Sequence, residues 1–460
     1  MASKEGRLQG MRQNTKVFDA YVELRLDRGM ALSTQPYKGT RDFYPEDMRI
    51  QRWMFNRMRE VVERYGYREY DGPMLEPFEL YAAKTGEEIV NQQLYWLMDR
   101  GERKLAIRPE MTPTLARMVA AKFHELPRPV RWFSTPNLWR YERPQRGRLR
   151  EHWQLNVDVL GGDPLLADAE ILSLALDVLR GFGGEKHVSI RVNNRRLMDH
   201  LFREKMGLNA ETALQVTKAL DARAKVGEEA YAKWLGDLGV DSQKRDVMER
   251  FFQSGFEETA KNLPCEGVTE LRSLFELLEQ SGAAGSVQFD PTVLRGLDYY
   301  TGTVFEMYDT SPDNRRAIFG GGRYDNLLAL FGNYKLSGVG FGMGDVTLRN
   351  FLETHQLLPS FGSAVDVFVS LPRPELRLHA EKVAQSCRSL GLRVITPLSS
   401  EGFGAQLKQA SKHGARFAVL FGDTEIAQGQ AMLKDLSTGE QVTVGLAELA
   451  PRIHQVIKGT

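Results

Sequence analysis

An arginine-rich segment carries the densest polar chemistry in the sequence. Its charged residues are Arg140, Glu142, Arg143, Arg146, Arg148 and Arg150, and it contains no lysine. An arginine can form two parallel hydrogen bonds to a phosphate or carboxylate, whereas a lysine presents a point charge. If a strand begins at Arg148, the side chains of Arg148 and Arg150 share one face. The segment indicates geometric recognition of phosphate or carboxylate, with a solvated hairpin surface as the alternative.

The next segment alternates between polar and apolar residues. Its polar members are Gln154, Asn156 and Asp158, and each is followed by Leu or Val. Successive side chains of a strand point to opposite faces. The pattern predicts a strand with one apolar face and one face that presents two amides and a carboxylate. That second face either lines a polar pocket or meets water.

Two later segments combine glycine with polar or aromatic residues. Arg295, Asp298, Tyr299 and Tyr300 surround a glycine turn, which suits a small polar ligand with a charged end. The run of glycines at 320–322 lets backbone approach a ligand closely. It is not a Walker loop, because no Gly-Lys-Ser/Thr follows, and it lacks the GxGxxG spacing.

Periodicity and turn residues predict the elements that must position these groups. Thr112 is expected to cap the helix that follows it, with Pro113 at the first helical position. The two strands that flank the arginine-rich segment are expected to be antiparallel. The predicted elements are a helix over 46–66, an extended segment over 67–75, a hairpin of 94–99 with 104–108, a helix over 112–122, strands within 130–142 and 149–161, and a helix over 164–180.

The second half of the chain changes character twice. Residues 195–285 have helical periodicity and predict a helical insertion, after which strands resume over 286–290, 303–308 and 338–344. Residues 358–364 resemble a linker. Beyond them, strands alternate with helices, which predicts a compact three-layer α/β domain with a mostly parallel sheet.

Length and composition exclude several classes of protein. A chain of 460 residues is longer than a single hydrophobic core usually serves, so two or three domains are expected. Lys plus Arg (61) nearly balances Asp plus Glu (60), so any site for a polyanion must be a local cluster. Two cysteines exclude a disulfide scaffold and fit a reducing compartment, and the eight histidines lack paired metal-ligand spacing. The sequence contains no apolar run of about 18 residues, so it predicts no membrane-spanning helix. We therefore expect a cytoplasmic protein without a protein-held metal.

Together, five segments resemble one family, histidyl-tRNA synthetase, a class II aminoacyl-tRNA synthetase. The resemblance covers roughly residues 36–455. Two of the segments resemble the motifs specific to histidine enzymes, and their order makes the resemblance specific. The segments are 36–42 (N-terminal signature), 66–73 (motif 1), 140–148 (motif 2), and 295–300 and 320–325 (the two histidine motifs).

The resemblance implies roles for residues that would bind ATP. Arg140 would hold the α-phosphate, Glu142 would meet the adenine and Arg148 would reach the γ-phosphate. His152 occupies the place of the phenylalanine that usually stacks on adenine. Arg295 would lie opposite Arg140 and would stabilise the charge that develops as the carboxylate of histidine displaces diphosphate. The implied catalytic residues are Arg295 and Arg140.

Other residues would bind histidine and tRNA. Glu110 and Thr112 resemble the contacts of the ammonium group, and Tyr299 and Tyr300 resemble the imidazole pocket. Further amino-acid contacts are expected at Gln154 and Asp158, and Gln145 and Arg150 are placed to approach the tRNA acceptor end. An imidazole has one donor and one acceptor nitrogen, so paired polar groups can recognise it.

The sequence departs from the family pattern at three positions. Asp158 replaces a common glutamate, and His152 replaces the stacking phenylalanine. Class II enzymes commonly carry an arginine on the helix after the glycine-rich strand, where this chain has Thr347. Arg349 lies about 200° further round the helix, so it cannot take that place without a register shift.

The resemblance implies an α+β fold in which an antiparallel sheet flanked by helices forms the catalytic core. The expected parts are an N-terminal extension (1–33), the core (34–194 and 286–357), the helical insertion (195–285) and a C-terminal α/β anticodon-binding domain (364–460). The implied activity is ligation of L-histidine to tRNA(His) through histidyl-adenylate, with ATP as substrate, Mg²⁺ accompanying ATP, and a homodimer formed through motif 1. The alternative is a non-catalytic paralogue, the regulatory subunit of ATP phosphoribosyltransferase.

Overall fold

The computed structural model describes residues 32–83, 89–282, 287–294, 299–314 and 316–459. The chain divides into two compact units, Met1–Leu358 and Pro359–Thr460. In the described part of unit 1 the α-helices are α2 (Pro45–Arg64), α3 (Phe78–Ala82), α4 (Thr112–Ala121), α5 (Pro164–Arg180), α6 (Arg195–Asp199), α7 (Ala210–Val226), α8 (Glu228–Asp237), α9 (Ser242–Gln253), α10 (Phe256–Asn262), α11 (Glu266–Gln280) and α12 (Asp345–Thr354).

The strands of unit 1 form a large sheet and a small one. The large sheet has nine strands in the order β1-β5-β7-β12-β11-β10-β8-β9, with β6 paired to β7, and the small sheet has the order β2-β4-β3. The strands are β1 (Arg68–Glu69), β2 (Leu75–Pro77), β3 (Trp96–Met98), β4 (Lys104–Ile107), β5 (Val130–Ser134), β6 (Asn137–Trp139), β7 (Glu151–Leu160), β8 (Val188–Asn194), β9 (Val287–Phe289), β10 (Thr303–Asp309), β11 (Ala317–Tyr324) and β12 (Gly338–Gly344).

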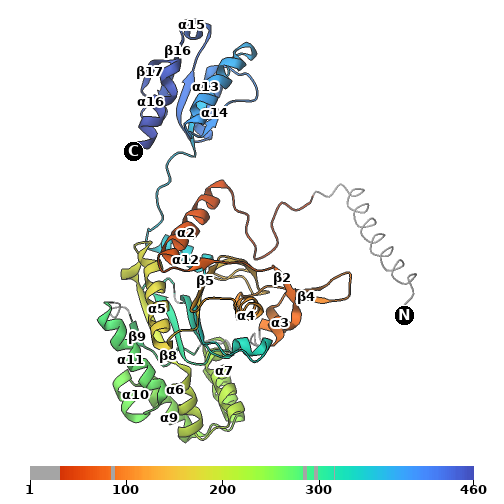
Figure 1. The fold of residues 1–460 in the computed structure, drawn as a ribbon, viewed down its shortest axis with the longest axis vertical. Helices are drawn as coiled ribbons and strands as arrows, with labels where there is room; N and C mark the ends of the chain where they lie inside the picture. Colours follow the sequence, from red (N-terminus) through yellow and green to blue (C-terminus); the bar gives the residue numbers. More distant parts are fainter. Residues whose placement is uncertain (1–31, 84–88, 283–286, 295–298, 315, 460) are drawn as a thin grey trace, which may run out of the picture. The chain divides into compact units, whose positions relative to one another are not determined.

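Antiparallel pairing dominates the large sheet. Strands β5, β7, β12, β11, β10 and β8 are antiparallel neighbours, and only the edge pairs β1–β5 and β8–β9 are parallel. Helices α2, α5 and α12 pack together with the sheet, and the helices from α6 to α11 gather at one end of it (Figure 1). The predicted fold class, an antiparallel core flanked by helices with a helical insertion, is confirmed.

Strand β7 separates the apolar core from the polar face of the sheet. Leu155, Val157 and Val159 point into the main core with α2, α5 and α12. The other face of β7 carries the polar residues and ends at Leu160, which packs into a second core with Leu115 of α4. Helix α4 therefore covers the side of the sheet on which the polar side chains lie.

Local chemistry explains where the helices begin. Asp163 caps α5, because its carboxylate accepts the N–H of Leu166 at 3.0 Å and Pro164 occupies the first turn. The expected cap of α4 is wrong: Met111 is the N-cap, no side chain caps it, and Thr112 is already helical. The first turn of α4 tolerates Pro113, because a backbone N–H at that position would have no partner within the helix.

Unit 2 is a five-stranded α/β domain. The sheet order is β14-β13-β15-β16-β17, in which β13, β14 and β15 are parallel and β16 and β17 pair antiparallel at one edge. The predicted β-α-β alternation is present, but the edge hairpin was not predicted. The elements are β13 (Val365–Val369), α13 (Arg377–Ser389), β14 (Val394–Ile395), α14 (Phe403–Lys412), β15 (Ala415–Leu420), α15 (Asp423–Ala427), β16 (Gln430–Asp435), β17 (Gln441–Gly445) and α16 (Leu446–Lys458).

Candidate active site

The polar face of β7 is buried and does not meet water. Asn156 and Asp158 are only 5% and 4% exposed, and Gln154 is partly buried. Of the two interpretations of this alternating segment, the solvated face is therefore excluded. A buried carboxylate needs partners, because burial of an unpaired charge is costly.

Asp158 finds its partner on another strand of the sheet. The hydroxyl of Tyr324, at the end of β11, donates to Oδ1 of Asp158 at 2.6 Å. Burial raises the pKa of Asp158 to about 7, the Tyr324 hydrogen bond opposes that rise, and the charge of Glu110 adds to it. Asp158 therefore titrates near neutral pH, and it lies close enough to Glu110 for the two carboxyl groups to influence each other.

Glu110 is buried in the segment between β4 and α4. Its Oε2 accepts a 2.8 Å hydrogen bond from the hydroxyl of Tyr299. Burial and the charge of Glu110 raise the pKa of Tyr299 far above its usual value, while a hydrogen bond with Thr112 opposes the rise. The Tyr299 ring lies 5.1 Å from that of Tyr300 and 5.9 Å from that of Tyr324, measured between centroids. Carboxylates and tyrosine hydroxyls thus converge in one buried place.

Glycines of β12 make room for this cluster. A Cβ on Gly340 would lie 2.3 Å from Oδ1 of Asp158, and one on Gly342 would lie 2.7 Å from Nε2 of Gln154. Both distances are shorter than any real contact of a Cβ atom. The glycine-dense strand is therefore required by the side chains of β7, which lie across its backbone.

The arginine loop, residues 140–150, differs from the sequence expectation. Strand β6 ends at Trp139 and β7 begins at Glu151, so the loop holds no regular strand. Gln145 and Arg148 pair as a bridge, and Gly147 has a φ of +78°, which a glycine adopts without strain. The condition under which Arg148 and Arg150 would share a strand face is not met, because β7 begins only at Glu151.

Two arginines connect this loop to its surroundings. Arg140 donates from Nε to the carbonyl oxygen of Pro109 at 2.9 Å, beside Glu110. Arg148 forms an ion pair with Glu142, with 3.2 Å between Nη1 and Oε2. The arginine loop and the cluster of carboxylates and tyrosines therefore meet at residues 109–110.

The two residues expected near the tRNA end have specific partners. Gln145 accepts a 3.1 Å hydrogen bond at Oε1 from Nη2 of Arg316. Arg150 donates from Nε to the carbonyl oxygen of Glu142 at 3.2 Å, and its guanidinium lies 4.0 Å from the ring centroid of Tyr141. Arg150 therefore braces the backbone of the arginine loop.

His152 lies at the start of β7, opposite Leu138 of β6. Burial, followed by the nearby charges of Arg140 and Arg41, lowers its pKa to about 3. The imidazole is neutral at neutral pH, as a stacking surface for a base requires. Its neighbour Trp153 is held in place by Asp345, whose Oδ1 accepts the backbone N–H of Trp153 at 3.0 Å.

Sequence reasoning missed two contributors. Tyr324 was noted only as part of the glycine motif, although a tyrosine beside glycines marks a side chain that fills the space they leave. Asp345 is fully buried and accepts 2.7 Å and 3.0 Å hydrogen bonds from Arg41 and Gln51, which joins α12 to the N-terminal segment. Such a long-range partnership leaves no local signal in the sequence.

The position of α12 at which an arginine was expected is occupied by Thr347, which brings no positive charge for a phosphate. The hydroxyl of Thr347 contacts the carbonyl oxygens of Ile318 and Gly344, at 2.6 Å and 3.1 Å. Arg349 pairs with Asp47 of α2 at 3.0 Å and with a glutamate of its own helix. Arg295 and Asp298, the other charged residues expected in the site, lie outside the described residues.

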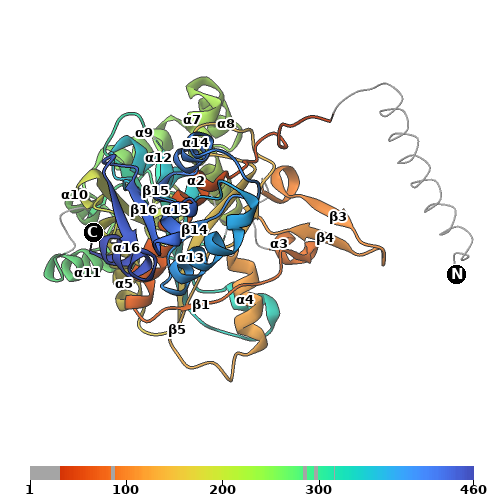
Figure 2. The same cartoon turned by 90° about the horizontal axis from the view of Figure 1, so that it is seen from above.

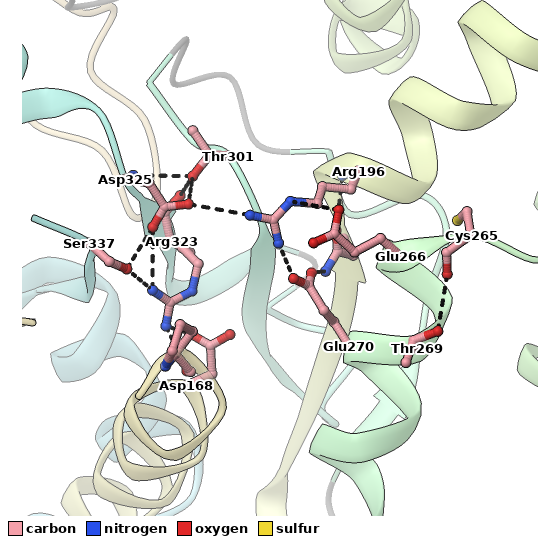
Figure 3. A network of polar contacts seen from close by, with 12 residues as sticks. Asp168, Arg196, Cys265, Glu266, Thr269, Glu270, Thr301, Arg323, Asp325 and Ser337 are labelled. Atoms are coloured by element: carbon pink, nitrogen blue, oxygen red, sulfur yellow. Dashed lines mark hydrogen bonds and ion pairs between the residues drawn. The ribbon is translucent and has the colours of Figure 1, made fainter. Parts of the chain in front are cut away.

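A polar network beneath the site joins three parts of the fold (Figure 3). Arg323, next to Tyr324, is 3% exposed at its side chain and binds Asp168 of α5 at 2.5 Å. It also approaches Asp325 at 3.4 Å, and Asp325 accepts a 2.7 Å hydrogen bond from Thr301. Arg196 of α6 continues the network towards Glu270 of the helical insertion. The network therefore fixes the chain at Thr301, next to Tyr300, and at Arg323, next to Tyr324.

Comparison with known proteins agrees with this geometry. Residues 39–346 match the family model for histidyl-tRNA synthetase, and residues 366–455 match that for an anticodon binding domain. The histidine–tRNA ligase of Leptospira biflexa is 45% identical over 92% of this chain and 98% of its own length. That of Haloarcula marismortui is 37% identical over 89% of this chain and 95% of its own. The crystal structure of histidyl-tRNA synthetase from Nostoc sp. PCC 7120 superimposes with a TM-score of 0.75 at 27% identity, covering 92% of this chain and all of that one. The chain belongs to the histidyl-tRNA synthetase family.

Proposed function

We propose that the chain ligates L-histidine to tRNA(His) through histidyl-adenylate and releases AMP and diphosphate. One observation carries the proposal: a buried cluster of carboxylates and tyrosine hydroxyls meets an arginine loop at residues 109–110. The cluster offers Glu110 and Asp158 to the ammonium group and imidazole of an amino acid. The loop offers guanidinium groups to a triphosphate, and Arg140 binds the carbonyl of Pro109 where the two meet.

The first step is attack by the carboxylate of histidine on the α-phosphorus of ATP. A bond forms between a carboxylate oxygen and phosphorus, and the bond from that phosphorus to the bridging oxygen breaks, so diphosphate leaves. Arg140 and Arg295 stabilise the charge on the α-phosphate oxygens, as the family resemblance implies. His152 and Glu142 receive the adenine, and the neutral imidazole of His152 supports stacking.

The second step transfers histidine to the 3′-terminal ribose of tRNA(His). A ribose hydroxyl attacks the carbonyl carbon of the adenylate, the bond from that carbon to the phosphate oxygen breaks, and AMP leaves as its phosphate takes the hydroxyl proton. We place Gln145 and Arg150 towards the acceptor end of the tRNA. The anticodon binding domain model that matches residues 366–455 supports a second tRNA contact in unit 2.

Magnesium enters this proposal as a companion of ATP. Among the described residues, no group of three or more His, Cys, Asp or Glu side chains could hold a metal ion. Mg²⁺ is commonly bound through substrate phosphates and few protein ligands. The described residues therefore do not form a cage for the ion, and no step above depends on one.

A homodimer is part of the proposal. The small sheet of β2, β4 and β3 extends from the body of unit 1 (Figure 2) and exposes large apolar side chains. These are Met74, Leu75, Trp96, Leu97 and Met98. Exposed apolar surface of this kind is typical of an interaction site, and β1 lies at an open edge of the large sheet beside it. A second copy of the chain, paired through motif 1, would cover this surface.

We also propose a cytoplasmic location. Cys265 and Cys387 are both free thiols, as expected in a reducing compartment. Within the described residues, no helix has the length and apolar character needed to span a membrane.

The test is histidine-dependent exchange of diphosphate into ATP by the purified chain, with Mg²⁺ and without tRNA. Exchange that requires histidine and is not supported by other amino acids is the expected result. The alternative, a regulatory subunit without aminoacylation activity, is not favoured, because relatives named histidine–tRNA ligase match about nine-tenths of the chain. Histidine binding without any exchange would reverse that judgement.

A further inference from the structure

Thr347 replaces the arginine that class II enzymes commonly carry on α12, but it occupies a position next to the arginine loop. Its hydroxyl donates to the carbonyl oxygen of Ile318 on β11 at 2.6 Å. Its methyl group lies 3.4 Å from where a Cβ of Gly147 would stand. Thr347 therefore lies between the start of β11 and the tip of the arginine loop, and it brings no charge there.

Another arginine reaches the same place from β11. Arg316 lies immediately before the first residue of β11, two positions before Ile318, and its side chain is exposed. Its Nη2 donates to Oε1 of Gln145 at 3.1 Å. Gln145 pairs with Arg148 across the turn of the loop. Arg316 is thus fixed beside Arg148 by a contact between residues that are 171 positions apart in the chain.

Positive charge exceeds negative charge where Arg316 approaches Arg148 and Glu142, and this excess favours binding of an anion. Partial burial and the positive charge of Arg148 lower the pKa of Arg316, and Glu142 opposes this effect. The carboxylate of Glu142 is already paired with Arg148 at 3.2 Å. A guanidinium does not lose its proton in a protein. The repulsion between Arg148 and Arg316 is therefore relieved when an anion with several negative oxygens binds between them.

We propose that Arg316 binds the terminal phosphates of ATP together with Arg148, and so supplies the positive charge that Thr347 lacks. This inference rests on the proposed function, because it assigns the anion to the triphosphate of the adenylation substrate. Arg316 reaches the nucleotide from the strand, whereas an arginine at position 347 would reach it from the helix.

Arg316→Ala tests the inference by direct binding. In calorimetric titrations with Mg²⁺ present, the Kd for ATP and that for diphosphate should rise roughly tenfold to a hundredfold, as expected for loss of a charge-assisted hydrogen bond. The Kd for AMP, which has no terminal phosphates, should stay within about twofold of the wild-type value. Arg316→Lys, which keeps the charge but loses the fork, should fall between the wild type and the alanine variant.

The comparison of AMP with ATP separates phosphate binding from a structural role. If Arg316 only held the arginine loop through Gln145, the variant would weaken AMP and ATP equally, because residues of that loop are also proposed to meet the adenine. Equal weakening, or an unchanged Kd for ATP, would overturn the inference. Arg349→Ala is the matched control, because its guanidinium faces Asp47 and Glu353 and not the loop.

The same proteins should be assayed for histidine-dependent exchange of diphosphate into ATP. Arg316→Ala should raise the KM for ATP and leave the KM for histidine unchanged. Failure of the wild-type chain to catalyse exchange would count against the proposed function, and the titrations would still decide whether Arg316 binds terminal phosphates.

Discussion

The hydroxyl of Tyr324 donates a 2.6 Å hydrogen bond to Oδ1 of Asp158, and both side chains are buried. The carboxyl group gains this one strong partner and lies near a second carboxylate, that of Glu110. One hydrogen bond does not offset burial, so the pKa of Asp158 rises to about 7. The fold thus keeps a buried carboxyl group whose pKa is close to neutral, at a cost in stability.

Asp158→Asn should stabilise the free protein at pH 8 more than at pH 5. The folded-state pKa of about 7 exceeds the ordinary value, so the folded chain holds a proton that the unfolded chain releases. Stability of the wild type therefore falls as the pH rises from about 4 to 7 and then levels off. Between pH 5 and 8 the variant should gain at most about 3 kcal/mol on the wild type, as seen by thermal unfolding without ligands.

Asp237→Asn, which removes an exposed carboxylate at the end of α8, is the matched control for that experiment. The Asp158 variant should also lose histidine binding. A pH-independent difference between Asp158→Asn and the wild type would show that Asp158 is ionised throughout this range.

Side-chain alternation predicted the polar face of β7. The period of two along 154–159 placed Asp158 on a polar face, and the structure shows that face buried. The sequence could not reveal that Tyr324 would complete the pair, because β7 and β11 are brought together only by β12 between them. A partnership between side chains on strands far apart in sequence depends on sheet order, which local patterns do not encode.

Other differences have local physical causes. The arginine loop was expected to contain part of a strand, but the turn at Gly147 ends pairing before β7 begins. In unit 2 the hairpin of β16 and β17 was missed because β17, Gln441–Gly445, is short and mostly exposed. Of its two valines only Val444 is buried in the core of the unit, so its hydrophobic pattern is a weak signal.

Gly340→Ala should weaken histidine binding. The new methyl group would lie 2.3 Å from Oδ1 of Asp158 and 2.5 Å from the carbonyl oxygen of Val157, so both Asp158 and the backbone of β7 beside it must move. The KM for histidine in the exchange assay should rise by at least about tenfold, the effect of about 1.4 kcal/mol. Gly344→Ala on the same strand is the control, because its methyl group would have an ordinary 3.5 Å contact with Thr347. Similar losses in both variants would mean that β12 tolerates no side chain, whatever lies opposite.

Arg323→Ala should destabilise unit 1 severely. The variant leaves the carboxylate of Asp168 buried without the guanidinium that it binds at 2.5 Å (Figure 3). Breaking one side of a buried ion pair costs about 3–5 kcal/mol, measurable by urea unfolding. The double variant Arg323→Ala/Asp168→Ala should be less destabilised than the sum of the single variants, because no unpaired charge remains. Additive losses would show that the pair contributes only packing.

Arg150→Ala should impair tRNA charging more than diphosphate exchange. Arg150 lies beside the arginine loop, and it is proposed to face the acceptor end of the tRNA. Its guanidinium also supports the carbonyl oxygen of Glu142 at 3.2 Å and stacks near Tyr141. Comparison of aminoacylation with tRNA-free exchange on one preparation separates these roles. Equal loss in both assays would assign Arg150 to support of the loop and remove it from tRNA recognition.

Lysines on unit 2 provide a test of the second tRNA contact. Lys408, Lys412 and Lys434 line a hollow of about 440 Å³ between α14 and β16. A cluster of positive charge on a unit that matches an anticodon binding domain suits an RNA backbone. The double variant Lys408→Glu/Lys412→Glu should raise the KM for tRNA(His) in aminoacylation and leave tRNA-free diphosphate exchange unchanged.

Salt dependence distinguishes a direct phosphate contact at this hollow from a general change in net charge. Each phosphate contact that is lost should reduce the slope of log K against log salt by about one. Lys382→Glu, on the exposed surface of α13 in the same unit, changes the net charge by the same two units as Lys408→Glu alone, but it lies outside the hollow and should leave that slope unchanged. Equal shifts from both changes would mean that unit 2 attracts tRNA only through its overall charge, and that the anticodon arm binds another surface of this unit.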